Sequence, residues 1–143
     1  MTVNENIAKQ FVGIRFEYGK SSHHSCDCFG LFLLILQKYS TQNTIYGNIH
    51  SIFTQLFYNQ QRCFEKINQI LLPYSTDSGD TNSQNVLVVI KIGKRLHCGI
   101  IFDYQSNKMI LHASEKNGVI ISNYQRFFEF GTEIARYNID KML

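Results

Sequence analysis

Two histidines and two cysteines lie close together at the start of the segment "HHSCDCFGLFLLILQKY", residues 23–39. These four residues, His23, His24, Cys26 and Cys28, are of types that bind zinc, form disulfides or act as nucleophiles. They directly precede an apolar block that is long enough to form a helix. Which chemistry applies therefore depends on the residues that the fold brings to this segment.

Free thiols are the first expectation for the four cysteines, because the N-terminus shows no basic region followed by an apolar stretch, as a signal peptide would. The other two are Cys63 and Cys98. Cys26 and Cys28 are also too close in sequence to bridge each other easily. A zinc site stays an alternative, although a C-x-C flanked by histidines departs from the usual spacing of zinc ligands.

Two more histidines, His97 and His112, occur in segments with the apolar pattern of β-strands. If the hairpin between them is symmetric about Tyr104 and Gln105, the two histidines stand directly opposite each other on one face. One imidazole can then act as a base while the other fixes its tautomer. Adjacent strand residues point to opposite faces, so we expect Cys98 to point away from His97 as a small buried side chain.

Cys28 is the expected nucleophile of this set. It would lie in the first turn of a helix capped by Asp27, where the helix dipole lowers the pKa of a thiol and free N–H groups can receive an oxyanion. Gly30 would keep the helix surface open beside it. Cys26 lies outside the helix and stays a weaker alternative, whereas Cys63 is expected to pack in the interior.

The elements that must position these residues follow from hydrophobic periodicity and turn residues. The pattern predicts helices over residues 4–13, 28–39 and, with breaks, 40–72; the second is apolar on every side and should be buried. After a polar loop, strands are predicted over residues 86–92, 95–102, 108–113, 118–122 and 132–139. Helices followed by a strand meander indicate an α+β fold, with the nucleophile on a buried helix packed on an antiparallel sheet.

Composition and charge narrow the class of protein. The 143 residues are 44% hydrophobic and 17% charged, which predicts a single globular domain over residues 1–143. The net charge of +3 comes from scattered Lys and Arg without a basic run, so we expect no nucleic-acid partner. The longest apolar block, residues 29–36, is too short to cross a bilayer, and we expect no membrane span.

The order of these motifs resembles the NlpC-type cell-wall cysteine peptidases, a compact papain-like family. "GIRFEYGKSSHHSCDCFGL" (residues 13–31) is similar to the family's "GxPYxxGG…DCSGL". "HCGIIFDYQSNKMILHASEKNGVII" (residues 97–121) is similar to its "HVGIYIGNGxMIHASxxxGVVI". The resemblance implies Cys28 as nucleophile, His97 as base and His112 as the residue that orients it, with no cofactor and no metal.

The same resemblance implies which residues meet the substrate. In the family, an Asp and a Ser beside the cysteine help to hold the free amine of the substrate, and a tyrosine hydroxyl lies near the nucleophile. Here Asp27 is kept, Phe29 replaces the serine, and Phe16 replaces the tyrosine. We therefore expect Asp27, Phe16 and Phe29 at the substrate, with one hydrogen bond to the oxyanion or substrate lost.

The details are most similar to the phage-tail and gene-transfer-agent branch of the family, whose members are equally short and carry a bulky apolar residue after the cysteine, as Phe29 does here. The resemblance implies hydrolysis of amide bonds in peptidoglycan stem peptides, next to D-Glu. It also implies tail-like proteins as partners. The expected location is a virion or tail particle acting on the cell wall, for a protein made in the cytoplasm without a signal peptide.

Two other classes of protein stay open at this stage. One is a catalytically silent tail-tip component with the same fold, favoured by the lost tyrosine and the bulky Phe29. The other is an amidase or acyltransferase that uses the same Cys-His-His set on a different amide. Transfer of an acyl group to an added amine would distinguish a transferase from a hydrolase.

Overall fold

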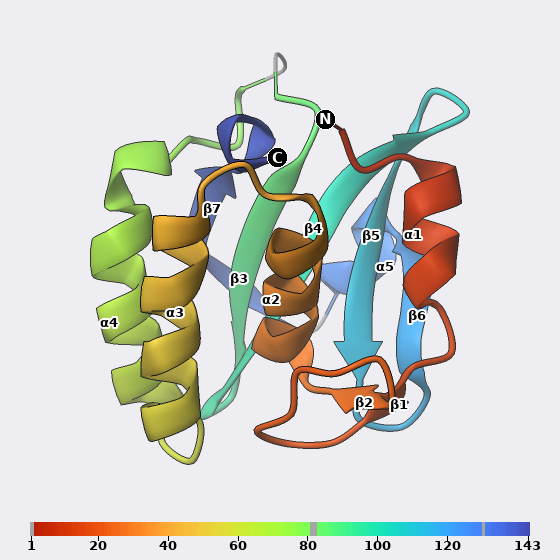
Figure 1. Ribbon diagram of the computed structural model, residues 1–143. Helices are drawn as coiled ribbons and strands as arrows, with labels where there is room; N and C mark the ends of the chain where they lie inside the picture. The colour runs from red at the N-terminus through yellow and green to blue at the C-terminus, as the bar shows by residue number, and fades with distance from the viewer. Residues whose placement is uncertain (1, 81–82, 130) are drawn as a thin grey trace.

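The computed structural model describes residues 2–80, 83–129 and 131–143 (Figure 1). Its first half is helical: α1 (Glu5–Phe11), α2 (Cys28–Tyr39), α3 (Asn43–Leu56), α4 (Gln60–Leu71) and the 3-10 turn η1 (Leu72–Tyr74). The second half holds β3 (Val86–Ile92), β4 (Arg95–Tyr104), β5 (Asn107–Ser114), β6 (Gly118–Asn123), α5 (Tyr124–Phe127), β7 (Thr132–Asn138) and η2 (Asp140–Met142). The predicted α+β class and the order of helices before strands are confirmed.

Five strands form one antiparallel sheet in the order β6-β5-β4-β3-β7. The first four make a meander, and β7 returns to pair with the free edge of β3, with an irregularity between Val89 and Ile90. Figure 1 shows α2 and α3 in front of the sheet and α5 behind it. The larger apolar core lies between the N-terminal helices and the sheet, and a smaller cluster around Phe127 covers the opposite face.

Helix α1 begins where predicted, because the Asn4 side chain caps it by accepting a hydrogen bond from the Ile7 N–H at 3.1 Å. It ends at Phe11, two residues earlier than predicted. The chain has already turned away by Gly13, whose φ of 96° is open to glycine but rarely to other residues.

Helix α2 is the buried central helix that the sequence predicts. Every residue from Cys28 to Leu36 is buried, because α2 has the sheet strands β4 and β5 on one side and α3 on the other. A helix with neighbours around its circumference has no polar face to present to water. Each large apolar side chain so buried contributes about 1.5–3 kcal/mol, so the first turn of α2 is rigidly held.

The segment before α2 is predicted as a loop but contains two short strands, β1 (Arg15–Phe16) and β2 (Ser25–Cys26), which pair in parallel. The loop between them presses on α2: a Cβ atom at Gly30 would lie 2.0 Å from the carbonyl oxygen of Lys20. The prediction that Gly30 keeps the helix surface open was therefore wrong. This glycine instead lets the backbone of the loop approach the helix.

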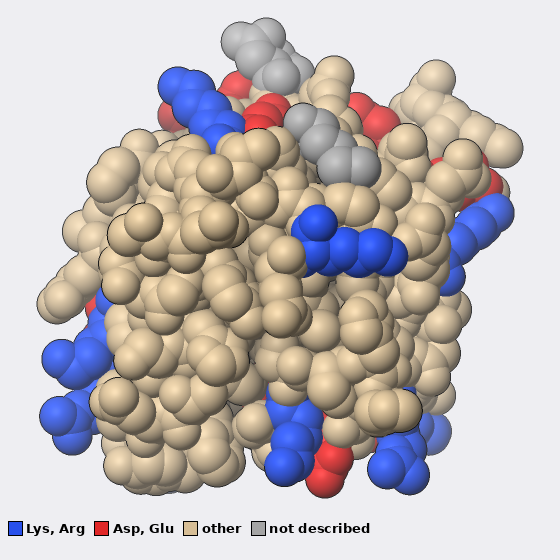
Figure 2. Space-filling view, in the orientation of Figure 1, with Lys and Arg blue, Asp and Glu red and all other residues tan. Residues whose placement is uncertain are grey.

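Figure 2 shows Lys and Arg side chains spread apart on the face that carries α2 and α3, with uncharged residues dominating between them. Within the described part of the chain, no helix has both the length and the apolar character needed to cross a bilayer.

Candidate active site

A cleft of about 720 Å³ lies where β4 and β5 part. The two strands pair only between their common turn and the pair Ile100–Leu111. Beyond that pair, the start of β4 and the end of β5 line the cleft from two sides, and the first residue of α2 reaches it as well. The three residues predicted to carry the chemistry, Cys28, His97 and His112, all line this cleft.

The hairpin that carries the two histidines turns one residue later than predicted. Gln105 and Ser106 form the two-residue turn, with φ of 48° and 68°, so Gly99 rather than His97 is directly opposite His112. The predicted centre at Tyr104 and Gln105 was wrong because Gln-Ser lacks the Asn-Gly signature of such turns. The residue opposite His112 is thus two positions away from His97. Because strand residues two apart point to the same face, both histidines still share one face, as diagonal neighbours.

The two histidines are hydrogen-bonded to each other. His97 Nε2 lies 2.8 Å from His112 Nδ1, and His112 Nε2 lies 2.8 Å from the Ser122 hydroxyl on β6. Burial, together with the charge of His97, lowers the pKa of His112 to about 3, so its ring is neutral at ordinary pH. Two tautomers of His112 fit these contacts. The one that leaves the other ring nitrogen of His97 free to act as a base has His97 Nε2–H donating to His112 Nδ1 and His112 Nε2–H donating to Ser122.

Ser122 was not predicted as part of this set. It lies on the same face of the sheet as His112, because Ile120 is the direct partner of His112 and Ser122 is two residues further along β6. In the sequence, Ser122 shows only as a polar residue in a predicted strand. Its contact with His112 arises from the pairing of β5 with β6, which that pattern does not reveal.

An aromatic ring and a glycine fix the position of the histidine pair. The Phe127 ring of α5 has its centroid 5.4 Å from that of His97 and 5.1 Å from that of His112. A Cβ at Gly99 would lie 2.5 Å from the Ile110 side chain and 3.2 Å from both the Cβ of His112 and the Phe127 ring. The absent side chain of Gly99 therefore makes room first for Ile110 and then for the packing of His112 against Phe127.

Cys28 is the first residue of α2, and Asp27 caps the helix as predicted. One Asp27 oxygen accepts from the Gly30 N–H at 2.7 Å and the other accepts from the Gly19 N–H at 2.8 Å. Within the described part of the chain, the N–H groups of Cys28 and Phe29 make no hydrogen bond. They are free donors at the N-terminus of α2, and they could stabilise the oxyanion that forms when Cys28 attacks a carbonyl group.

The thiol of Cys28 is the acidic one. Hydrogen bonding from Cys98, followed by hydrogen bonding from His97 and the charge of that ring, lowers the pKa of Cys28 well below its ordinary value, although burial acts in the opposite direction. Cys98 is buried, as predicted, but it contacts the sulfur of Cys28 from the helix side of β4.

The remaining thiols are protonated at neutral pH. Burial raises the pKa of Cys26 to about 12 and that of Cys63 to about 11, and burial together with the hydrogen bond to Cys28 raises the pKa of Cys98 well above its ordinary value. All four cysteines are free. Cys28 is thus the one cysteine of the chain that combines a low thiol pKa with a position in the cleft.

Of the residues predicted to meet the substrate, Asp27 and Phe16 line the cleft and Phe29 does not. Phe29 is 6% exposed and belongs to the apolar core behind the cleft. Burial, then the nearby Cys28 thiolate, raises the pKa of Asp27 to about 7. Phe16 packs edge-on against Tyr18, with ring centroids 4.8 Å apart. A tyrosine, Tyr18, therefore lines the cleft two residues after Phe16, the residue that replaces the tyrosine of the family.

His23 and His24 are exposed and lie outside the cleft lining. Among the described residues, no three His, Cys, Asp or Glu side chains are arranged to hold a metal ion. Comparison of the chain with models of known protein families and with curated proteins gave no match. A function for the chain therefore rests on the geometry of the cleft and on its motifs.

Proposed function

We propose that the chain is a cysteine peptidase with a compact papain-like fold of the NlpC type, which hydrolyses amide bonds of peptidoglycan stem peptides. The observation that carries the proposal is the geometry of the cleft: Cys28 is the first residue of a buried helix, it lines the same cleft as His97, and a second histidine is hydrogen-bonded to His97. A catalytically silent component has no need of such an arrangement. The peptidoglycan substrate, the cut next to D-Glu and the association with a phage tail or gene transfer agent come from the motif resemblance.

The first half of the reaction forms an acyl-enzyme. His97 takes the proton of Cys28, and the thiolate attacks the amide carbonyl carbon, so that a C–S bond forms and the carbonyl oxygen becomes an oxyanion. The free N–H groups of Cys28 and Phe29 stabilise that charge. The oxyanion then collapses, the C–N bond breaks, and the His97 imidazolium gives its proton to the leaving amine.

The second half releases the acid. Water attacks the thioester while His97 removes its proton, and the tetrahedral intermediate expels the Cys28 thiolate and releases the acid. Return of the proton from His97 to Cys28 restores the starting state. His112 is a positioning residue: its Nδ1 accepts from His97 Nε2, which leaves the other ring nitrogen of His97 for the sulfur. Ser122 in turn holds His112 in the required tautomer.

Digestion of purified peptidoglycan, with mass analysis of the released fragments, tests the proposal. We expect the wild-type protein to release fragments with new termini at D-Glu, and Cys28→Ala to release none while keeping the same circular dichroism spectrum. Cys63→Ala is the matched control, because it removes a buried thiol of raised pKa outside the cleft and should keep activity.

Either of two results would count against the proposal. Fragment release by Cys28→Ala would exclude Cys28 as the nucleophile. A reactive Cys28 that forms acyl-enzymes with simple amides or thioesters, but releases nothing from peptidoglycan, would keep the thiol chemistry and exclude the substrate. Acyl transfer to an added amine in preference to water would indicate an acyltransferase.

A further inference from the structure

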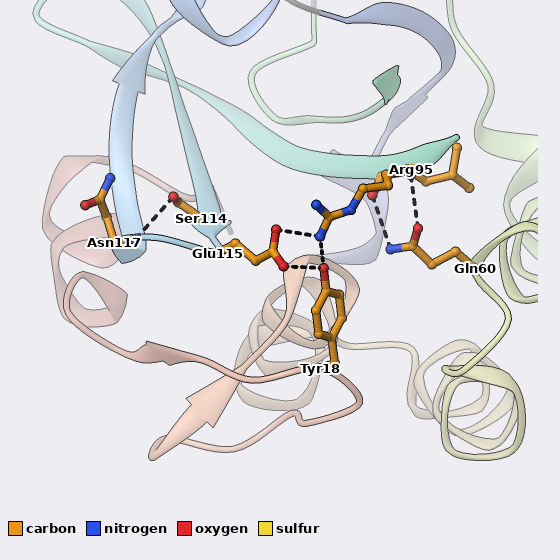
Figure 3. Close-up of polar contacts among 7 residues, drawn as sticks. Tyr18, Gln60, Arg95, Ser114, Glu115 and Asn117 are labelled. Carbon is orange, nitrogen blue, oxygen red and sulfur yellow. Dashed lines mark hydrogen bonds and ion pairs between the residues drawn. The ribbon is translucent and has the colours of Figure 1, made fainter. Parts of the chain in front are cut away.

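Three charged or polar side chains meet at one side of the cleft without any part in the steps above. The Arg95 guanidinium lies 2.5 Å from the Glu115 carboxylate and donates a hydrogen bond to the Tyr18 hydroxyl. The Tyr18 hydroxyl donates to the other oxygen of Glu115 at 2.7 Å. Figure 3 shows the three groups pointing toward one another from three segments: the loop after β1, the start of β4 and the turn after β5.

This cluster is close to the reacting groups. Arg95 is two residues before His97 on β4 and so lies on the same face, about 6.6 Å along the strand. The charge of His97 contributes to the lowered pKa of Glu115, after the hydrogen bonds from Tyr18 and Arg95. Arg95, Tyr18 and Glu115 all line the same cleft as Cys28.

The start of β4 is hydrogen-bonded to helix α4 beyond the point where its pairing with β5 ends. Leu96 N–H donates to the Gln60 side chain at 3.2 Å, and the Gln60 amide donates back to the Leu96 carbonyl at 3.4 Å. Figure 3 shows Gln60 reaching toward the strand that carries Arg95. These two hydrogen bonds join Gln60, the first residue of α4, to the backbone of the residue that follows Arg95. The guanidinium is consequently presented to the cleft from a fixed backbone.

The pair that Arg95 makes with Glu115 is exchangeable. Its side chains are 57% and 50% exposed, and an exposed ion pair of this kind contributes little net free energy. A guanidinium offers a planar fork of donors that matches a carboxylate. Glu115 already shows a carboxylate bound to Arg95 and Tyr18, so a carboxylate of a ligand can take the same place.

We propose that Arg95 and Tyr18 bind a carboxylate of the substrate, one or two residues from the amide that Cys28 attacks, in exchange for Glu115. The spacing follows from the 6.6 Å or so between Arg95 and His97, which one or two extended residues cover. The inference rests on the proposed function, since it names the substrate class of the same cleft: amides that carry a free carboxylate close to the scissile bond.

Alkylation of Cys28 by two reagents of equal shape tests this without a known substrate. N-iodoacetylglycine carries a carboxylate one residue from the carbon that the thiol attacks, and N-iodoacetylglycinamide carries a neutral amide there, so the ratio of their rates reports the charge selection of the cleft. We expect Arg95→Gln to lower the ratio of the acid to the amide reagent by about threefold, and Tyr18→Phe by less, since one exposed charge contact is being removed. Glu115→Gln should raise the ratio, because it releases Arg95.

Lys94→Gln is the matched control, since it removes the same charge from the neighbouring residue, which does not line the cleft. Equal ratios in Arg95→Gln and Lys94→Gln would overturn the carboxylate site while leaving Cys28 reactive and the proposed function standing. Failure of both reagents to alkylate Cys28 selectively in the wild type would instead overturn the proposed function, and the carboxylate site with it. A drop confined to Arg95→Gln and Tyr18→Phe supports the site.

Discussion

His112 carries a cost that follows from its position. A histidine whose pKa falls from 6.5 to about 3 on folding binds fewer protons in the folded state than in the unfolded state. Its contribution to stability is present above pH 6.5 and is lost as the pH falls toward 3. At about 1.4 kcal/mol for each pKa unit, this loss is on the order of 5 kcal/mol.

We therefore predict that His112→Asn flattens the acid side of the stability profile. The Asn carbonyl can still accept from His97 Nε2–H but cannot be protonated, so the free energy of unfolding should fall less between pH 6.5 and 3 than in the wild type. Urea unfolding at a series of pH values measures this. His24→Asn, at an exposed histidine outside the cleft, should leave the profile unchanged; parallel profiles for wild type and His112→Asn would contradict the burial argument.

The pKa shift of Asp27 has the opposite effect on how stability depends on pH. Its pKa of about 7 in the fold lies above the ordinary 3.8, so its contribution to stability is present below about pH 4 and is lost as the pH rises through 7. Burial is the main cause, and the Cys28 thiolate is the second. The reactive thiolate thus destabilises the carboxylate that caps its own helix.

Cys28→Ala should consequently lower the pKa of Asp27, because a buried negative charge has been removed from beside the carboxylate. Carbon-13 NMR of the Asp27 carboxyl against pH measures this pKa. Cys63→Ala again serves as the control. An Asp27 pKa that does not move in Cys28→Ala would show that the thiolate and the carboxylate are not coupled.

At the scale of elements, two helical glycines make opposite predictions. A Cβ at Gly30 of α2 would lie 2.0 Å from the Lys20 carbonyl, whereas a Cβ at Gly47 of α3 would meet nothing within 4 Å. Gly30→Ala should lower the free energy of unfolding by about 1–3 kcal/mol and disturb the loop that carries Tyr18. Gly47→Ala should raise it by about 0.5–1 kcal/mol. Urea unfolding of both variants decides, and equal effects would contradict the close contact of loop and helix.

The sequence identifies the long elements because their periodicity runs over many residues. Helix α2 and strands β3 to β7 lie within one or two residues of their predicted positions. The short elements β1, β2 and α5 have too few residues to show a period, and tertiary contacts decide their conformation. Phe127 of α5 was missed for that reason, whereas Ser122 lies in a strand that was predicted, and its contact with His112 depends on how β6 pairs with β5.

The site shows the same division. Cys28, His97 and His112 were found because each lies in an element of strong pattern, and the shared face of the histidines survived a turn that was one residue off. Phe29 was expected in the cleft from its place beside Cys28, but successive helical residues point in different directions, and Phe29 faces the core. The Tyr18–Arg95–Glu115 cluster joins three segments that no sequence spacing connects.

At the scale of the molecule, the two ends of the chain lie together, away from the cleft. Figure 1 shows both termini at the end of the sheet opposite β1 and β2. The buried side chain of Asn85 accepts from the Val3 N–H at 2.8 Å and donates to the carbonyls of Val3 and Ile101. Its backbone N–H donates to Asp140 at 2.6 Å. One asparagine thus joins the N-terminal segment, β3, β4 and η2.

Asn85→Ala should lower the Tm by roughly 10 °C, because it leaves buried backbone groups of Val3 and Ile101 unpaired, at a cost of about 2–4 kcal/mol. The rate of Cys28 alkylation well below the Tm should not change, since Asn85 does not line the cleft. Gln84→Ala, at the exposed neighbouring position, should shift the Tm little. Scanning calorimetry and alkylation kinetics on the same samples separate the two effects. If alkylation slows in Asn85→Ala at temperatures where the protein is fully folded, closure of the termini and the geometry of the cleft are coupled through β4, and the independence of the two ends of the molecule is refuted.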